Sequence, residues 1–391
     1  MRARFQALPI LCVLTAGLAG PAAAGVVVHE KGETKIEVGA LVQTQYSRED
    51  PEDGEATDDL SFRRLRPHIA GTVGKNWWAK VQLDFARAID GAEVAVKDAY
   101  VQYKGWQADQ HLVLTLGNAK TPFSRNFLTS SAKQQTVERG FAGNHNYGTP
   151  DRQLGLRLDG HSGSERLTWA LAAGAEHHDP DVRRMDFDTP TSNQSDWNQG
   201  WVVAGRVDFH PLGFVAFDHG DFHSDAVKYN LSLAYFTWSN DGDVDTYTHP
   251  ASGTSVSQSR ADLDHADGWE ISAGLRGNGF SLDAELQQVH GDTMDPAFTG
   301  GIYADGGTDL DKLLVQGGYM LPGDRFELVA KWDSLDADNY ADPWQSWELG
   351  LNHFWDQHKL KAQVTFRRSE NVDGIAGADA DTLFAQFQYV F

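Results

Sequence analysis

The sequence has almost no cysteine and no long apolar run. Its single cysteine, Cys12, lies within the first 24 of the 391 residues, so disulfides cannot stabilise the rest of the chain. Past residue 24 no segment approaches the ~18 consecutive apolar residues of a membrane-spanning helix, which excludes that class of membrane protein. Residues 1–24 combine a basic start, an apolar middle and the small residues Ala22–Ala24. They are predicted to be a signal peptide for export, followed by one domain over residues 25–391.

Positive charge is scarce as well. The chain has 33 lysines and arginines against 55 aspartates and glutamates, a formal net charge of −22 that becomes −24 once the two arginines of the signal peptide are removed. So acidic a chain is not expected to bind nucleic acid. Aromatic residues, in contrast, are abundant for a polar sequence: 20 Phe, 12 Trp and 11 Tyr. These features together are typical of a transmembrane β-barrel, whose apolar residues are spread by alternation.

Apolar and polar residues alternate over many short segments. In KLKAQVTFRR (359–368) and WWAKVQLDF (77–85) every second residue is apolar, and about ten such residues make one tilted strand across a bilayer. Sixteen segments of this kind are predicted, near residues 34–46, 60–73, 76–86, 96–105, 111–118, 153–160, 166–176, 199–210, 225–239, 268–277, 280–290, 312–321, 325–335, 346–356, 358–368 and 381–391. The expected fold is all-β, a 16-stranded antiparallel transmembrane barrel. A soluble β-sandwich is the alternative that also alternates.

The predicted connections differ in length on the two sides of the barrel. Tight turns near 74–76, 277–279, 322–324 and 356–358 alternate with long polar loops at 47–59, 119–152, 177–198, 240–267, 291–311, 336–345 and 369–380. Short periplasmic turns and long outer loops characterise outer-membrane barrels. Residues 211–224 are predicted to form an elaborated turn, although a short extra strand is possible there. The chain ends on Phe391, with Tyr389 and Phe387 on the same strand face, as is typical of such barrels.

The long loop over residues 119–152 is predicted to fold inward and narrow the pore. Its basic residues exceed its acidic ones by three, whereas the first outer loop, SREDPEDGEATDD (47–59), holds seven carboxylates and one arginine. Acidic charge is thus concentrated outside, and an inward loop would line the pore with donors. If the loop stayed outside, its charges would be ordinary solvated surface.

The stretch FRRLRP (62–67) begins the second predicted strand. Strand parity places Leu65 toward lipid and both Arg64 and Arg66 toward the lumen. Arg63 has lipid-side parity, so we expect it to reach the rim or to be redirected by a β-bulge. On the next strand Lys80 also points inward. Guanidinium groups suit phosphate-like oxyanions.

An alternative interpretation of the same arginines is structural. Their charges could be satisfied inside the lumen by Asp84, Glu138 and other carboxylates. The arginines would then brace the barrel wall and would not meet a passing anion.

Several ordered blocks carry a family resemblance. FRRLRP, WWAKVQLDF, VKDAYVQY, LTLGNAKTPFSRNFLTSSAKQQTVERGFA and GTPDRQLGLRL, most clearly over residues 60–160 and again over 199–212, resemble the phosphate-selective porin O/P family of Gram-negative outer membranes. The resemblance implies a homotrimer of sixteen-stranded barrels, each with its own pore for phosphate or related anions. It implies pore positions for Arg63, Arg64, Lys80 and Lys120. With the other basic residues of strand two and the long loop, the predicted anion-binding set is Arg63, Arg64, Arg66, Lys80, Lys120, Arg125, Lys133 and Arg139.

The predicted function is therefore passive diffusion of small hydrophilic solutes, with a preference for anions, through an outer-membrane porin in contact with outer-membrane lipid and lipopolysaccharide. No cofactor and no catalysis are expected. The metal-like run from Glu176 to Asp179 lies in a predicted loop with no further ligand at useful spacing. A general or cation-preferring porin, or a structural or adhesive barrel, would fit the same strand pattern.

Overall fold

The computed structural model describes residues 25–86, 94–106, 111–179, 183–190, 198–242, 247–248, 255–256 and 261–391. The predicted signal peptide, residues 1–24, lies outside them, as do parts of the predicted loops at 177–198 and 240–267. No helix among the described residues is long and apolar enough to span a membrane.

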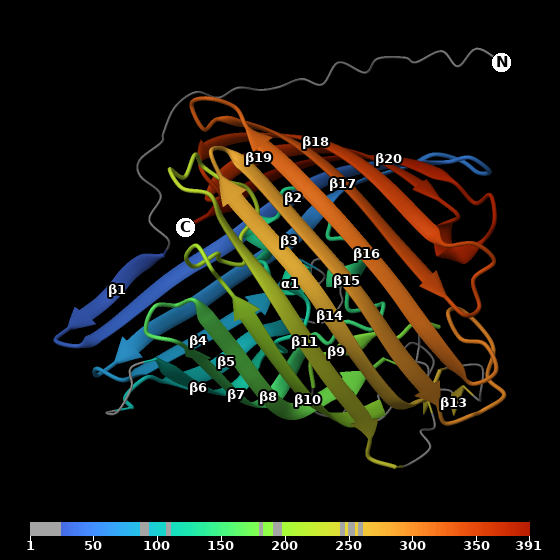
Figure 1. Ribbon diagram of the computed structural model, residues 1–391, viewed down its shortest axis with the longest axis horizontal. Coiled ribbons are helices and arrows are strands. Elements are labelled where there is room, and N and C mark those ends of the chain that lie inside the picture. Colours follow the sequence, from blue (N-terminus) through green and yellow to red (C-terminus); the bar gives the residue numbers. More distant parts are fainter. Residues whose placement is uncertain are drawn as a thin grey trace.

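Sixteen antiparallel strands close into a barrel (Figure 1). In ring order they are β2 (Thr34–Pro51), β3 (Thr57–Val73), β4 (Trp77–Asp84), β5 (Ala95–Tyr103), β6 (Leu112–Lys120), β7 (Arg152–His161), β8 (Leu167–His178), β10 (Asn198–Phe209), β11 (Lys228–Asn240), β14 (Leu263–Gly277), β15 (Phe280–Thr293), β16 (Gly307–Met320), β17 (Phe326–Ala337), β18 (Trp344–Asp356), β19 (Leu360–Glu370) and β20 (Ala380–Val390). Each predicted segment overlaps one of these strands, so the predicted fold is confirmed, although β2, β3, β14 and β16 extend into residues predicted to be outer loops.

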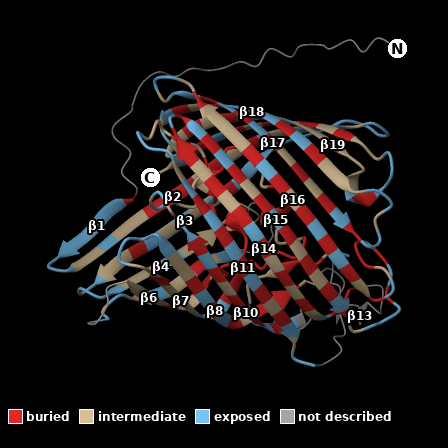
Figure 2. Ribbon diagram, in the orientation of Figure 1, coloured by how far each residue is buried: buried red, intermediate tan, exposed pale blue. Residues whose placement is uncertain are grey.

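Burial alternates along the strands, because one face meets lipid and the other meets the interior (Figure 2). On β11, Leu231, Leu233 and Tyr235 are exposed on the outer face, whereas Phe236 and Trp238 point inward and are fully buried. The period of two read from the sequence is thus the in-and-out alternation of a barrel wall.

The first and last strands close the barrel. β2 pairs with β20 from Leu41↔Val390 onward, and beyond that point the Ala40 N–H donates to the Phe391 carbonyl over 3.0 Å. Gly39 lies beside this junction, where an added Cβ would be 2.3 Å from the Phe391 carbonyl oxygen. A side chain at residue 39 would therefore force the closing strands apart.

We predict that Gly39→Ala impairs barrel closure. The expected cost of overpacking is about 1–3 kcal/mol, seen as a lower yield of the folded, heat-modifiable band on a gel after refolding into detergent. Gly317→Ala on β16 is the matched control, because a Cβ there meets nothing closer than 3.4 Å. Equal yields for the two variants would contradict the prediction.

Two strands lie in the same sheet without entering the ring. β1 (Val26–Lys31) pairs with the start of β2 and forms a hairpin that extends past the barrel end (Figure 1). β9 (Phe187–Asp188) pairs with β8. β1 was not among the predicted strands. The short β12 (Tyr247–Thr248) and β13 (Ser255–Val256) form a separate two-stranded sheet.

Residues 210–227 form an elaborated turn without a strand, as predicted. The turn folds back into the barrel: His219 is buried, and its imidazole contacts the Gln316 side chain at 3.0 Å. The same turn also contacts β14, where Arg276 donates to the Asp218 carbonyl, and the β18–β19 connection, where His358 contacts the His219 carbonyl at 2.9 Å.

One side of the barrel interior, called the packed half below, is filled by protein. The inward loop 121–151, called L3 below, packs against β10 to β19, in part around a core of buried apolar side chains. That core consists of Phe123, Phe141, Tyr147, Met185, Phe187, Val202, Ala204, Ala234, Phe236, Trp238, Ala261, Leu263, Ala266, Val289, Phe298, Ile302, Tyr303, Leu310, Leu335 and Ala337. Large inward-facing aromatic residues on β11 exclude water from this side.

Candidate functional site

L3 folds into the barrel, as predicted, and side chains of the wall formed by β16 to β19 hold it there. Its short helices are α1 (Arg125–Leu128), η2 (Ser131–Lys133) and η3 (Phe141–Gly143). Three buried lysines of the wall donate to L3 carbonyls: Lys312 to Tyr147 over 2.7 Å, Lys331 to Glu138 over 3.1 Å and Lys361 to Gln134 over 2.7 Å. Inward lysines on this wall are therefore anchors for the loop.

A buried ionic cluster fixes the start of L3. The Arg125 Nε donates to Asp283 over 2.7 Å, and both side chains are nearly inaccessible. The Ser124 hydroxyl and the Asn126 backbone N–H donate to the two oxygens of Glu285, over 2.5 and 2.7 Å. β15 thus binds the first turn of L3 through charge-assisted hydrogen bonds.

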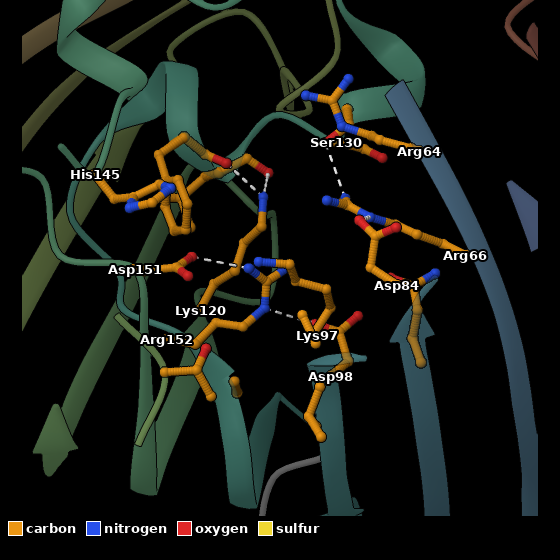
Figure 3. A pocket seen from close by; sticks show the side chains of 18 of the residues that line it. Arg64, Arg66, Asp84, Lys97, Asp98, Lys120, Ser130, His145, Asp151 and Arg152 are labelled. Atoms are coloured by element: carbon orange, nitrogen blue, oxygen red, sulfur yellow. Dashed lines mark hydrogen bonds and ion pairs between the residues drawn. The ribbon is translucent and has the colours of Figure 1, made fainter. Parts of the chain in front are cut away.

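The space left by L3 is a cavity of about 1350 Å³ along the opposite wall, β3 to β7 (Figure 3). It is lined from Val94, before β5, to Lys104, just past the other end of that strand. The lining contains ten lysines and arginines against eight carboxylates, in a chain whose net charge is −22. The cavity thus reverses the charge balance of the whole protein.

A β-bulge turns Arg63 into this cavity. The β2–β3 register passes from Gln43↔Arg64 to Thr44↔Phe62, so Arg63 is the extra residue on β3. Its guanidinium forms two hydrogen bonds to Glu138 of L3, of 2.6 and 2.8 Å. The bulge expected from strand parity is therefore present, and it places two consecutive arginines inside the barrel.

A second bulge does the same for Lys97. The β4–β5 register passes from Gln82↔Asp98 to Leu83↔Val96, which leaves Lys97 as the extra residue on β5. Lys97 lines the cavity beside Asp98. Lys97 was not among the predicted site residues, although the argument used for Arg63 applies to it as well. Strand alternation would turn this lysine toward lipid, which is costly unless a bulge redirects the side chain.

Several cations in the cavity are paired with wall or loop carboxylates. The Arg66 Nε donates to Asp84 over 2.6 Å, and Lys80 donates to Asp98 over 2.6 Å. Arg152 contacts Asp98 at 3.1 Å and Asp151 at 2.8 Å. The pairing of Arg63 with Glu138 and of Arg66 with Asp84 agrees with the structural interpretation of these arginines. These ion pairs tie Arg63 to L3 and Arg66 to the neighbouring strand.

Five cavity cations form no ion pair within the described part of the chain: Lys104, just past the end of β5, and the four residues Arg64, Lys97, Lys120 and Arg139, which lie closer to L3. We call these four residues, without Lys104, the unpaired cation cluster. Arg64 is buried and its Nη1 donates to the neutral Gln43 side chain over 2.8 Å, while its buried Nε has no hydrogen-bond partner.

Carbonyl oxygens at the C-terminal end of α1 accept hydrogen bonds from two other members of this cluster, Lys120 and Arg139. Arg139 donates to the Thr129 carbonyl over 2.7 Å, and Lys120 donates to the Phe127 carbonyl and, over 3.2 Å, to that of Leu128. The Phe127 ring lies 4.6 Å from the Lys120 ammonium and 5.7 Å from the Arg139 guanidinium. Carbonyl and ring partners hold these cations in place without cancelling their charge.

This environment shifts the pKa values of two neighbouring residues of L3, Glu138 and Arg139. Burial, and then the neighbouring Arg66 and Arg152, lower the pKa of Arg139 to about 9, so the group is still cationic at neutral pH. Burial would raise the pKa of Glu138, but the Arg63 guanidinium outweighs it and holds that pKa below its usual range. Glu138 is therefore a fixed anion, and Arg139 is a cation whose charge is poorly compensated.

The structure brings six of the eight predicted residues around one cavity: Arg63, Arg64, Arg66, Lys80, Lys120 and Arg139. The other two lie elsewhere. Arg125 is buried against β15, and Lys133 pairs with Asp218 of the 210–227 turn at 2.8 Å.

The residues Glu176 to His178 of the metal-like run form the buried end of β8, so the prediction that they lie in a loop was wrong. Glu176 accepts from Thr121, His178 contacts the Arg184 carbonyl, and the side chains of a strand alternate in direction.

A closed sixteen-stranded barrel, narrowed by an inward loop that leaves a charged channel along one wall, defines an outer-membrane porin. The family model described as phosphate-selective porin O and P matches residues 36–391. The chain belongs to that family, which confirms the resemblance seen in the sequence and places the protein in the Gram-negative outer membrane as a channel and not an enzyme.

Solved porins share the fold. They include OmpT of Vibrio cholerae in its trimer form (11% identity, TM-score 0.56, covering 92% of this chain and 100% of that one). An anion-selective porin from Comamonas acidovorans is similar at 13% identity and TM-score 0.57, with 92% and 100% covered. DcaP of Acinetobacter baumannii is similar at 12% identity and TM-score 0.55, with 94% and 100% covered. A comparison with curated proteins finds no match.

Proposed function

We propose that this porin passes small hydrophilic solutes and prefers anions, phosphate-like oxyanions in particular. The observation that supports it is the unpaired cation cluster. Arg64 and Arg139 offer guanidinium forks, and Lys97 and Lys120 offer ammonium groups, to the same cavity. Charges held away from bulk water need compensation, and an oxyanion inside the channel supplies it through charge-assisted hydrogen bonds.

The paired cations fit conduction as well as structure. A channel needs sites that bind an ion well enough to admit it and weakly enough to release it. Arg66, Lys80 and Arg152 share their charge with Asp84, Asp98 and Asp151, so each attracts an anion less strongly than an unpaired cation would. Paired and unpaired cations line the same cavity, so an anion would meet binding sites of different strength as it passes.

Planar-bilayer recording on the full-length protein tests the proposal. In a KCl gradient we expect a reversal potential of anion-selective sign, and added phosphate should reduce the chloride current in a concentration-dependent way. A cation-selective reversal potential would contradict the anion preference. Selectivity near zero without phosphate block would favour the general porin, and the absence of any current would favour a structural barrel.

Three further features belong to the proposal. We infer that residues 1–24 are removed as a signal peptide and that residues 25–391 form the mature barrel domain. We infer a homotrimer, because OmpT of Vibrio cholerae has a trimer form on the same fold; an unheated gel or native mass measurement of the purified protein tests this. Outer-membrane lipid and lipopolysaccharide are the expected surroundings of the exposed apolar belt.

A further inference from the structure

Three potential metal ligands meet at the outer mouth of the cavity, where L3 approaches the segment between β8 and β10. His145 of L3 and Asp186 and Asp188 of that segment have ligand atoms within 4.8 Å of one another. All three residues line the cavity, and His145 Nδ1 lies 2.6 Å from an Asp186 oxygen. This cluster is distinct from the unpaired cation cluster, and it is the only group of this kind in the part of the chain that the structure describes.

The backbone holds the two aspartates in place. Residues 185–188 are extended, with Met185 and Phe187 fully buried in the core. Because side chains alternate along an extended segment, Asp186 and Asp188 both turn to the opposite side, toward the cavity. β9 pairs with β8 through His177↔Asp188, so Asp188 is fixed from the side opposite to L3.

His145 is placed against the same segment by backbone hydrogen bonds. The Phe187 N–H donates to the His145 carbonyl over 3.2 Å, and the Gly148 N–H donates to the Met185 carbonyl over 2.8 Å. The three ligands therefore come from two segments that the hydrophobic core ties together. The backbone of both segments is therefore in place, and an ion would replace the hydrogen bond between His145 Nδ1 and Asp186.

The donor set indicates the class of ion. One imidazole nitrogen with two carboxylate oxygens suits a transition metal such as Zn²⁺, whereas Ca²⁺ and Mg²⁺ prefer oxygen ligands alone. The Asp188 carboxylate accepts no hydrogen bond and forms no ion pair among the described residues, so it is free to coordinate. Three protein ligands leave at least one coordination position open, and all three side chains line the cavity.

We infer that His145, Asp186 and Asp188 form a divalent transition-metal site, best suited to Zn²⁺, at the outer mouth of the pore. The bound ion would neutralise two carboxylates at the mouth of the cavity that the anions traverse. The existence of the site does not depend on the proposed anion preference. The effect on current does rest on it, because only an anion-preferring pore gains from positive charge at its mouth.

Zinc binding to the purified full-length protein tests the site, with Zn²⁺ itself as the probe. We expect one Zn²⁺ per chain by titration calorimetry and by metal analysis after gel filtration. Asp188→Asn should weaken binding by at least about tenfold, since even the loss of an outer-shell partner costs about 10–100-fold. This variant removes no hydrogen bond among described residues, and His145→Ala should give the same loss.

The matched control is His290→Ala, because His290 also lies near two aspartates, Asp292 at 3.2 Å and Asp309 at 2.9 Å, but on the outer barrel surface. It should leave the pore-site titration unchanged. No binding, or binding that survives both Asp188→Asn and His145→Ala, would overturn the site. Binding that leaves the reversal potential of an anion-selective channel unmoved would overturn the role assigned to it in anion access.

Discussion

Replacing Lys120 and Arg139 together by glutamine is expected to weaken phosphate block of the channel by at least about tenfold and to shift the reversal potential toward zero. Both side chains are held by carbonyls of L3 and not by carboxylates, so their charge is available to an ion in the cavity. At an effective dielectric constant of about 20, one charge about 6 Å from a bound anion contributes roughly 3 kcal/mol. Salt reduces this, and an about tenfold change corresponds to only about 1.4 kcal/mol.

The comparison that isolates pore charge is with Lys133→Gln. Lys133 lies in the same loop but pairs with Asp218 and does not line the cavity, so its loss should leave selectivity unchanged. Glu138→Gln should act in the opposite direction and strengthen phosphate block, because it releases Arg63 from its carboxylate partner. If Lys133→Gln altered selectivity as much as the double variant did, the general charge of L3 and not the unpaired cluster would control the pore.

The strand count, the inward loop and the direction of Arg64 could be predicted from the sequence because each depends on local pattern. Lipid on one side and the barrel interior on the other impose a period of two on every strand. Strand parity also revealed Arg63 as an exception that a bulge could resolve, and the bulge is present. The same reasoning applied to Lys97 would have found the second bulge.

The division of the interior into a packed half and an open half could not be predicted in this way. It depends on which wall L3 contacts, and that choice is made by pairs far apart in sequence, such as Arg125 with Asp283 and Lys361 with the Gln134 carbonyl. Strand alternation predicts that a lysine points inward, but it does not distinguish whether the ammonium group contacts water, a passing anion or a loop carbonyl. For this reason Arg125 and Lys133 could not be separated from Arg139 before the structure placed them.

Asp283→Asn is expected to destabilise the inward segments more than any surface substitution. Asp283 is buried on β15 and accepts from Arg125 of L3 over 2.7 Å and from Arg276 over 3.0 Å. Arg276 in turn donates to the Asp218 carbonyl of the 210–227 turn. One carboxylate therefore connects both segments that fill the packed half, and its loss leaves two buried guanidinium groups without a negative partner.

The expected cost is about 3–5 kcal/mol, the range found when one partner of a buried ion pair is removed. The variant should unfold at lower denaturant concentration in detergent, and protease should cleave L3 faster. Asp292→Asn on the same strand is the control, since its side chain is 55% exposed and its loss should cost little.

A second substitution separates charge compensation from simple loss of packing. Arg125→Met in the Asp283→Asn background removes one of the two stranded cations and keeps an apolar stem in the same space. The double variant should therefore be more stable than the sum of the two single effects predicts, by about 1–3 kcal/mol of coupling. Strict additivity would show that Arg125 and Asp283 do not act as a pair, and L3 would then be held mainly by its aromatic contacts, such as that between Phe123 and Phe236.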